Sequence, residues 1–360
     1  MPVPAFQDQE RIFARALAVL RQGIEQRAFP GAACGVVHRG KLVACHALGR
    51  FTYDPGSPQI LPGTIFDLAS LTKAVATATM AMVLYQRGLL DLDAPLAGVV
   101  PEFLRHDPRR AEVTLRMLLD HSSGLPAYLR LFEAAATREE LLAEALGAPL
   151  EAEPGTRAAY SDIGFMLLGE ALARLADDTL DRFCRREIFG PLAMADTLFR
   201  PPPDLRPGIP PTEDDRSFRR RILQGEVHDE NASVLGGVAG HAGLFAPAGD
   251  LARFAHCLLS GGPPVLRDTT LSLFTRRSGP SGSSWALGWD TPSPPSQSGR
   301  HFSPGAFGHL GYTGTSLWID PERQFAVALL TNRTWPDRGS QEIKEIRPRF
   351  HDAVVEALPQ

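Results

Sequence analysis

Ser70 and Lys73 lie three positions apart in the apolar stretch ASLTKAVATATMAMVLYQRG, which begins at Ala69. On a helix, residues at positions i and i+3 share a face, so this spacing predicts that the hydroxyl and the amine are neighbours. Burial among apolar residues lowers the pKa of a lysine, and a neutral amine can take the serine proton and activate the oxygen as a nucleophile. The pattern indicates covalent catalysis, although a surface Ser and Lys on an ordinary helix give the same four letters.

The scarcity of lysine favours the catalytic interpretation. Of 37 basic residues only Lys41, Lys73 and Lys344 are lysine, so the remaining 34 are arginine. Arginine is not deprotonated in proteins, whereas a buried lysine can be. A lysine kept at position 73 therefore suggests that its amine must lose a proton, although a composition bias could also leave three lysines by chance.

Two further groups of residues follow in the chain. Tyr160-Ser161-Asp162 precedes an expected helix, and a Tyr hydroxyl can relay a proton if neighbouring cations lower its pKa. Ser161 or Asp162 could equally well cap that helix. The segment from Gly308 to Gly314, GHLGYTG, is expected on a strand. Glycine within a strand indicates close approach by a ligand or by another backbone, or simply a kinked edge strand.

A polar segment, GEVHDEN, runs from Gly225 to Asn231 and is followed by GHAG at 240–243. His228, Asp229 and His241 could form a metal site, but their spacing matches no standard motif. A rigid polar wall of a cleft, or a hydrogen-bonded loop, is the favoured interpretation. We therefore expect no metal and no cofactor.

The secondary-structure elements that must position these residues differ between the two ends of the chain and its middle. Strands are expected at 31–51 and, near the other end, at 308–319 and 324–332, with amphipathic helices at 6–27 and 339–357. The middle is dominated by helices, at about 69–88, 114–120, 137–147, 162–176 and 179–189. Residues 200–216 and 278–304 read as loops.

This pattern predicts an α+β fold. One antiparallel sheet is built from both chain ends and flanked by helices, and a mainly helical region is inserted beside it. The expected boundaries are 1–75 with 230–360 for the sheet region and 76–229 for the inserted region, with the active site between them.

Together the three motifs resemble those of the serine β-lactamase and penicillin-binding-protein superfamily, closest to class C β-lactamases, DD-peptidases and related esterases. That family has Ser-x-x-Lys, Tyr-x-Asn and Lys-Thr-Gly or His-Thr-Gly in this order. The similarity extends over about residues 10–355 and includes the turn from His121 to Leu125, HSSGL, and the Gly-Leu-Phe at 243–245.

The resemblance implies a role for each matching residue. Ser70 is acylated, and Lys73 and Tyr160 share the base and acid roles. The backbone N–H groups of Ser70 and Tyr312 form the oxyanion hole, beside His309 and Gly311. The family fold is an antiparallel sheet flanked by helices, with a helical domain alongside.

The sequence departs from the family pattern at three positions. Asp162 replaces Asn, and a carboxylate accepts hydrogen bonds where an amide also donates them, so Asp162 could bind Lys73 instead of the substrate. His309 replaces the Lys that holds a substrate carboxylate, and Leu310 replaces a Thr. A neutral His holds a carboxylate less well. These changes favour an esterase or peptidase over an efficient β-lactamase.

Composition and charge exclude several other classes. A net charge of −4 and a pI of about 6.2 give no sign of a nucleic-acid partner. No apolar run approaches the ~20 residues of a membrane span. The N-terminal stretch lacks the basic start of a signal peptide, so we expect a cytoplasmic protein. The four cysteines are scattered and are interpreted as free buried thiols; they are Cys34, Cys45, Cys184 and Cys257.

The function expected from the sequence is that of a serine hydrolase forming an acyl-enzyme with a small ester or amide. An alternative is a D-Ala-D-Ala carboxypeptidase or an amidase of muropeptides or D-amino acids. An alternative of another class is a non-catalytic ligand-binding or β-lactam-sensing module on the same fold. The sequence determines neither the natural substrate nor the oligomeric state.

Overall fold

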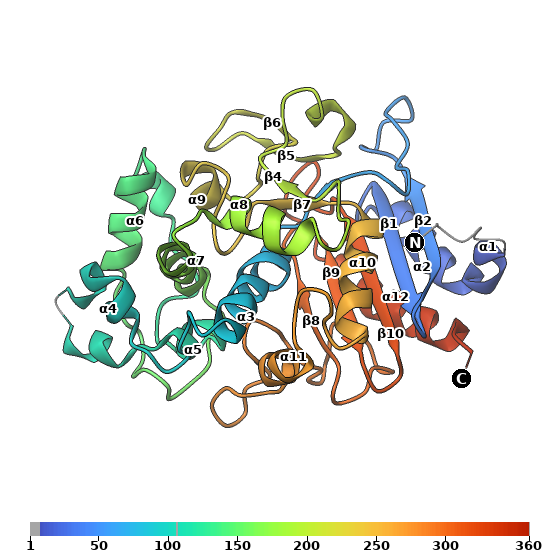
Figure 1. Ribbon diagram of the computed structural model, residues 1–360. Coiled ribbons are helices and arrows are strands. Elements are labelled where there is room, and N and C mark those ends of the chain that lie inside the picture. The colour runs from blue at the N-terminus through green and yellow to red at the C-terminus, as the bar shows by residue number, and fades with distance from the viewer. Residues whose placement is uncertain (1–7, 106, 360) are drawn as a thin grey trace.

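A five-stranded antiparallel sheet connects the two ends of the chain. The computed structural model describes residues 8–105 and 107–359. Within them the strands have the order β2-β1-β10-β9-β8, so the first and the last strands of the chain meet at the β1–β10 pair. Figure 1 shows these blue and red segments side by side. The strands of this sheet are β1 (Gly31–His38), β2 (Lys41–Gly49), β8 (Phe307–Leu310), β9 (Ser316–Asp320) and β10 (Phe325–Thr331).

The central strands are buried on both faces because helices cover the sheet on either side. The strands β1, β9 and β10 are buried along their whole length, which explains their continuous runs of apolar and small residues. Helices α2 (Ala14–Glu25) and α12 (Ile343–Ala357) pair on one face, and α10 (Ala248–Leu259) packs on the other. A short helix, α1 (Gln9–Ile12), precedes α2.

The middle of the chain forms a helical region beside the sheet (Figure 1). Helix α7 lies at its centre and is buried along most of its length. The side chain of Ser161 caps α7 by accepting a hydrogen bond from the N–H of Gly164, at 3.0 Å. The helices of this region are α3 (Thr79–Gln86), α4 (Leu96–Val99), α5 (Leu115–Leu119), α6 (Arg138–Gly147), α7 (Asp162–Ala176) and α8 (Leu180–Cys184).

Short strands connect the two regions. β7 (Leu244–Ala246) pairs with β3 (Phe66–Asp67) on one side and with β4 (Leu198–Phe199) on the other. This small sheet fixes the chain just before Ser70. β5 (Pro211–Asp215) pairs with β6 (Arg221–Gln224), and helices α9 (Glu230–Val234) and α11 (Asp268–Thr275) complete the fold.

The predicted fold class is confirmed: an antiparallel sheet from both chain ends, flanked by helices, with a mainly helical insertion. The boundaries at 75/76 and 229/230 stay a prediction. Residues 6 and 7 of the predicted first helix lie outside the described residues. Among the described residues, no helix is both long and apolar enough to cross a membrane.

Two local predictions were wrong. The segment 308–319 is two strands, because the chain reverses between Leu310 and Ser316. The segment 200–216 is only partly an exposed loop, since β5 within it is largely buried. In both cases pairing with a strand distant in sequence, or with the next strand of a hairpin, outweighs the local signal of glycines, prolines and charges.

Packing at Gly240 gives a test of how the two regions fit together. A Cβ atom there would lie 2.1 Å from the carbonyl oxygen of Phe165 and 2.9 Å from the Cα of Gly169, both on α7. We expect Gly240→Ala to lower the free energy of unfolding by about 2–4 kcal/mol, because backbone must move to admit the methyl group. Urea denaturation would measure this. Gly249→Ala is the matched control. A Cβ atom at this position has no neighbouring atom of the described residues within 4 Å, and the substitution should stabilise α10. If both substitutions changed the free energy of unfolding equally, the close packing of Gly240 against α7 would be contradicted.

Candidate active site

Ser70 lies at the start of the helical segment that continues into α3. The residue before it, Ala69, has a left-handed backbone with φ +46°, a conformation that costs energy for a residue with a side chain. The carboxylate of Asp67 supports it by accepting the N–H of Ala69 at 2.8 Å. A π-helical turn, Lys73–Ala78, follows, and such turns are frequent at functional sites. The nucleophile candidate is therefore held by a strained and braced turn.

The amine of Lys73 is completely buried and contacts three oxygen atoms. Its Nζ donates to Ser70 Oγ at 2.9 Å and to the carbonyl oxygen of His241 at 3.0 Å. The same Nζ forms an ion pair with Asp162 Oδ1 at 2.6 Å. The predicted neighbourhood of Ser70 and Lys73 is confirmed, and Asp162 does bind Lys73, as the Asn-to-Asp replacement suggested.

Two opposing effects act on the proton of Lys73. Burial lowers the pKa of its amine, because the charged form loses its hydration, and the Asp162 carboxylate partly opposes this by stabilising the ammonium. The net direction is downward. An amine with a lowered pKa and a hydroxyl at 2.9 Å can exchange a proton with that hydroxyl.

Tyr160 reaches the same serine from another side. Its hydroxyl donates to Ser70 Oγ at 2.7 Å and lies 3.2 Å from Asp162 Oδ1. Burial, followed by the nearby Asp162 carboxylate, raises the pKa of Tyr160 well above its ordinary value. The condition considered from the sequence, a pKa lowered by neighbouring cations, is not met here, because burial and the Asp162 carboxylate both raise the pKa of Tyr160. Tyr160 is thus a neutral hydroxyl that can pass a proton between two oxygen atoms.

The turn between β8 and β9 approaches Ser70 through its backbone. Thr313 Oγ1 donates to the carbonyl oxygen of Asp67 at 2.8 Å, and Thr315 Oγ1 to that of Leu68 at 2.9 Å. Gly311 must be glycine here, because a Cβ would lie 2.3 Å from the Leu68 carbonyl oxygen. Among the described residues neither Ser70 N–H nor Tyr312 N–H has a hydrogen-bond partner. Both donors are available to a ligand.

His309 lies on β8 beside these groups and is buried. One ring nitrogen, Nδ1, is 2.7 Å from the carbonyl oxygen of Leu310, and the other has no partner among the described residues. Burial, followed by the charge of Lys73, lowers the pKa of His309 to about 3. The ring is therefore neutral near pH 7 and does not replace the positive charge of the family lysine.

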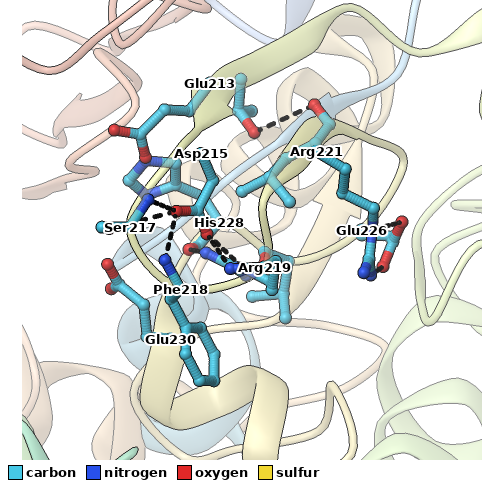
Figure 2. A network of polar contacts seen from close by, with 12 residues as sticks. Glu213, Asp215, Ser217, Phe218, Arg219, Arg221, Glu226, His228 and Glu230 are labelled. Carbon is cyan, nitrogen blue, oxygen red and sulfur yellow. Dashed lines mark hydrogen bonds and ion pairs between the residues drawn. The ribbon is translucent and has the colours of Figure 1, made fainter. Parts of the chain in front are cut away.

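His228 and Asp229 line the cavity at Ser70, whereas the ring of His241 is buried behind it. His228 Nε2 contacts Glu213 Oε2 at 2.8 Å, and the His228 carbonyl oxygen accepts from Arg219 at 2.6 Å (Figure 2). Within residues 8–105 and 107–359 no group of His, Cys, Asp and Glu is arranged to hold a metal ion. The arrangement is that of a hydrogen-bonded wall.

The cavity has a volume of about 650 Å³ and one strongly basic side. Arg338 there is paired with the carboxylates of Glu213 and Glu230. Arg333 and Arg347 are only 6% and 4% exposed, and no carboxylate among the described residues pairs with either. Their guanidinium groups donate to uncharged oxygens, and burial, followed by the charge of Arg333, lowers the pKa of Arg347 to about 9.

Aromatic and apolar residues complete the lining. Trp285, from the loop 278–304, lies 5.7 Å from the Tyr160 ring, measured between centroids. Tyr312 is 48% exposed, with the guanidinium carbon of Arg333 4.3 Å from its ring centroid. A pocket with aromatic walls and a few convergent polar groups is typical of a small-molecule site.

Comparison with known proteins identifies the family of the chain. The family profile described as Beta-lactamase matches residues 16–347. The chain belongs to the β-lactamase family. This superfamily of serine hydrolases includes β-lactamases and DD-peptidases.

The relatives of this β-lactamase-family chain have several names. An N-acetylmuramyl-L-alanine amidase of Bacillus subtilis (strain 168) is 34% identical over 85% of this chain and 77% of its own length. A provisionally named D-alanyl-D-alanine carboxypeptidase of Escherichia coli (strain K12) is 33% identical over 75% of this chain and 69% of its own. In structure, the hydrolase EstCE1 covers 96% of this chain and 99% of its own, with a TM-score of 0.78 and 21% identity. The last likeness concerns the fold alone.

Several residues of this family site escaped the sequence analysis. His121 accepts the N–H of Ser161 at 3.1 Å and so orients the Tyr160 segment, although only its turn was noted. Arg333 and Arg347 could not be distinguished among 34 arginines, because their lack of carboxylate partners is a tertiary property. The local pattern that could have drawn attention to Arg333 is the polar pair Asn332-Arg333, directly after an apolar strand.

His309 predicts a measurable pH dependence of stability. In the unfolded chain its pKa is near 6.5 and in the folded protein about 3, so between these values the unfolded state binds more protons and stability falls as pH falls. His309→Asn, whose amide can replace the contact with the Leu310 carbonyl, should remove up to about 1.4 kcal/mol per pH unit from that slope. Denaturant titrations from pH 8 to pH 4 would measure it. At pH 8 the ring is neutral in both states, so the stability difference between wild type and His309→Asn at that pH gives the packing cost alone. If stability fell equally with pH in both proteins, the low pKa of His309 would be contradicted.

Proposed function

We propose that this protein is a serine hydrolase that cleaves a small amide or ester through an acyl-enzyme on Ser70. The observation that carries the proposal is that Ser70 Oγ lies within hydrogen-bond distance of both Lys73 Nζ, at 2.9 Å, and Tyr160 Oη, at 2.7 Å. A nucleophile with a base in direct contact, and a third group that orients the base, is the arrangement that covalent catalysis requires.

In the acylation step Ser70 Oγ attacks the carbonyl carbon of the substrate. Its proton moves to the neutral form of Lys73, whose pKa burial lowers. Tyr160 gives its phenol proton to the leaving nitrogen or oxygen and takes one back from the Lys73 ammonium through Asp162, which contacts both. The C–N or C–O bond then breaks and an ester to Ser70 remains. Asp162 contacts both Lys73 and Tyr160 and keeps the two proton carriers aligned.

The developing negative charge on the carbonyl oxygen needs donors that do not have to reorganise. The N–H groups of Ser70 and Tyr312 meet this requirement, since neither has a partner among the residues described. The hydrogen bonds from Thr313 and Thr315 hold the Tyr312 turn against the chain before Ser70. In the deacylation step a water molecule takes the place of the leaving group, and the same proton carriers act in reverse.

The substrate that we favour carries a carboxylate near the cleaved bond. Arg333 and Arg347 are buried cations on the cavity wall that have no carboxylate partner among the residues that the structure describes, and burying such charges is costly unless an anion compensates them. A peptide-like amide with a free carboxylate would supply that anion. The relatives named as an amidase of N-acetylmuramyl-L-alanine and as a D-alanyl-D-alanine carboxypeptidase support the same choice.

A non-catalytic sensor of the same fold is the second candidate. It would also be acylated at Ser70 but would retain the acyl group. Around Ser70 lie an amine with a lowered pKa, a neutral phenol and two N–H donors without partners among the described residues, which together can serve both half-reactions. We therefore favour turnover.

The nucleophile can be tested by intact-protein mass spectrometry after incubation with p-nitrophenyl acetate and, separately, with a fluorescent penicillin. Wild type should gain the acyl mass and Ser70→Ala should not. Ser70→Ala should also lose at least about 10³-fold in hydrolysis, because the covalent route is gone. Full activity of this variant would exclude the mechanism.

Lys73→Arg separates a proton acceptor from a mere positive charge. Arginine keeps the charge but does not deprotonate, so acylation should fall by about 10²-fold or more while the thermal unfolding temperature changes little. Stopped-flow acylation with p-nitrophenyl acetate would measure it. Wild-type rates in this variant would mean that another group takes the proton.

Arg347→Met tests whether Arg347 binds the carboxylate of the substrate. The Michaelis constant for a D-Ala-D-Ala peptide with a free terminus should rise about 10- to 100-fold, because a charge-assisted hydrogen bond is lost. The same peptide with a carboxamide terminus is the matched control and should be affected little. An equal effect on both peptides would indicate that Arg347 only supports the fold.

A further inference from the structure

We propose that Asp229 and His241 form a positioning pair for Lys73, in which the pair fixes one oxygen ligand of the amine and adds a second negative charge beside it. This inference rests on the proposed role of Lys73 as proton acceptor. It assigns a purpose to the segments 225–231 and 240–243, which the acyl-transfer steps above do not use.

The two side chains are locked together. His241 Nε2 lies 2.8 Å from Asp229 Oδ1, and the His241 ring is almost completely buried. Asp229 Oδ1 also accepts the N–H of Ala232 at 2.7 Å and so caps α9. The carboxylate is therefore held from two directions and in turn fixes the orientation of the ring.

The loop that carries His241 is joined to the helical segment of Ser70 and Lys73 by three hydrogen bonds. The carbonyl oxygen of His241 accepts from Lys73 Nζ at 3.0 Å, and that of Gly240 accepts from Thr77 Oγ1 at 2.6 Å. The N–H of Leu244 donates to Thr72 Oγ1 at 3.1 Å. A displacement of His241 would move the acceptor that fixes the direction of the Lys73 amine, and hence its alignment with Ser70.

The charges around Lys73 come from several elements. Asp162, the first residue of α7, and Asp229, directly before α9, are the anions that raise its pKa against the larger, lowering effect of burial. The rings of His121 and His309 face it as neutral groups, because burial and the charge of Lys73 lower their pKa values. Tyr160 faces it as a neutral phenol.

Asp229 acts through its charge and not as a proton acceptor. Burial would raise the pKa of its carboxyl group, but His241, the Ala232 N–H and Lys73 hold it well below its ordinary value. Asp229 is therefore ionised across the working pH range. The charge of Asp229 raises the pKa of Lys73 and the charge of Lys73 lowers the pKa of Asp229, so removing one must change the proton affinity of the other.

The chain offers a direct readout, since it contains only Lys41, Lys73 and Lys344. Labelling lysine with ¹³C at Cε would give one NMR signal for each, assigned with Lys41→Arg and Lys344→Arg. In Asp229→Asn, which retains the shape and the helix cap, the titration midpoint of Lys73 should fall by about one pH unit relative to wild type. An unchanged midpoint in a folded Asp229→Asn protein would overturn the proposal.

Glu230→Gln is the matched control, because it removes one negative charge from the same wall, at a carboxylate paired with Arg338 and not with His241. Its Lys73 midpoint should stay at the wild-type value. A fall equal to that of Asp229→Asn would show a general effect of net charge and would overturn the specific pairing.

Kinetics test the positioning role of the ring. His241→Leu should lower kcat by about tenfold or more with little change in KM, whereas His241→Gln, which can still donate to Asp229, should restore part of the loss. Equal losses in both would overturn the role of the ring. The NMR titration does not depend on hydrolysis, so an inactive wild type with a shifted Lys73 would refute only the proposed function.

Discussion

The amine of Lys73 is completely buried, and in the proposed mechanism its proton must be held loosely enough to be exchanged with Ser70. A buried ammonium without acceptors would lose several kcal/mol of hydration. Here three oxygens receive it, from Ser70, from Asp162 and from the main chain at His241. Each acceptor belongs to a different part of the chain. The helical region, the loop that carries His241 and the segment after β3 therefore have to meet at Lys73 Nζ.

This requirement explains features that would otherwise look unrelated. The small sheet of β3, β7 and β4 fixes the strained turn at Ala69, and the absence of a side chain at Gly240 lets the loop pass close to α7. Ser161 caps α7, while its neighbours Tyr160 and Asp162 contact Ser70 and Lys73 respectively. The geometry at Ser70 is thus a product of packing between the two regions and not of any single segment.

Asp162 distinguishes the electrostatics of this site from the family pattern with asparagine. A carboxylate at 2.6 Å favours the ammonium form of Lys73 and disfavours a tyrosinate at Tyr160. The opposite wall contributes Arg333 and Arg347 as cations without carboxylate partners among the residues described, while the buried His309 is neutral. The positive charge on the cavity wall thus lies on the C-terminal segment of the chain, and not on the strand where the family pattern has a lysine.

The amino-acid sequence determined the fold class, most of the helices and the pairing of Ser70 with Lys73. These follow from periodicity and from a spacing of three residues, together with a known order of motifs. The replacement of the family asparagine raised the contact of Asp162 with Lys73 as an option, and the structure shows it. It did not reveal the reversal of the chain after Leu310, the buried strand β5, the raised pKa of Tyr160, or the two arginines without carboxylate partners. Those properties depend on which residues distant in the chain come to lie within a few ångströms, and on how much water they lose. Only the tertiary structure decides both.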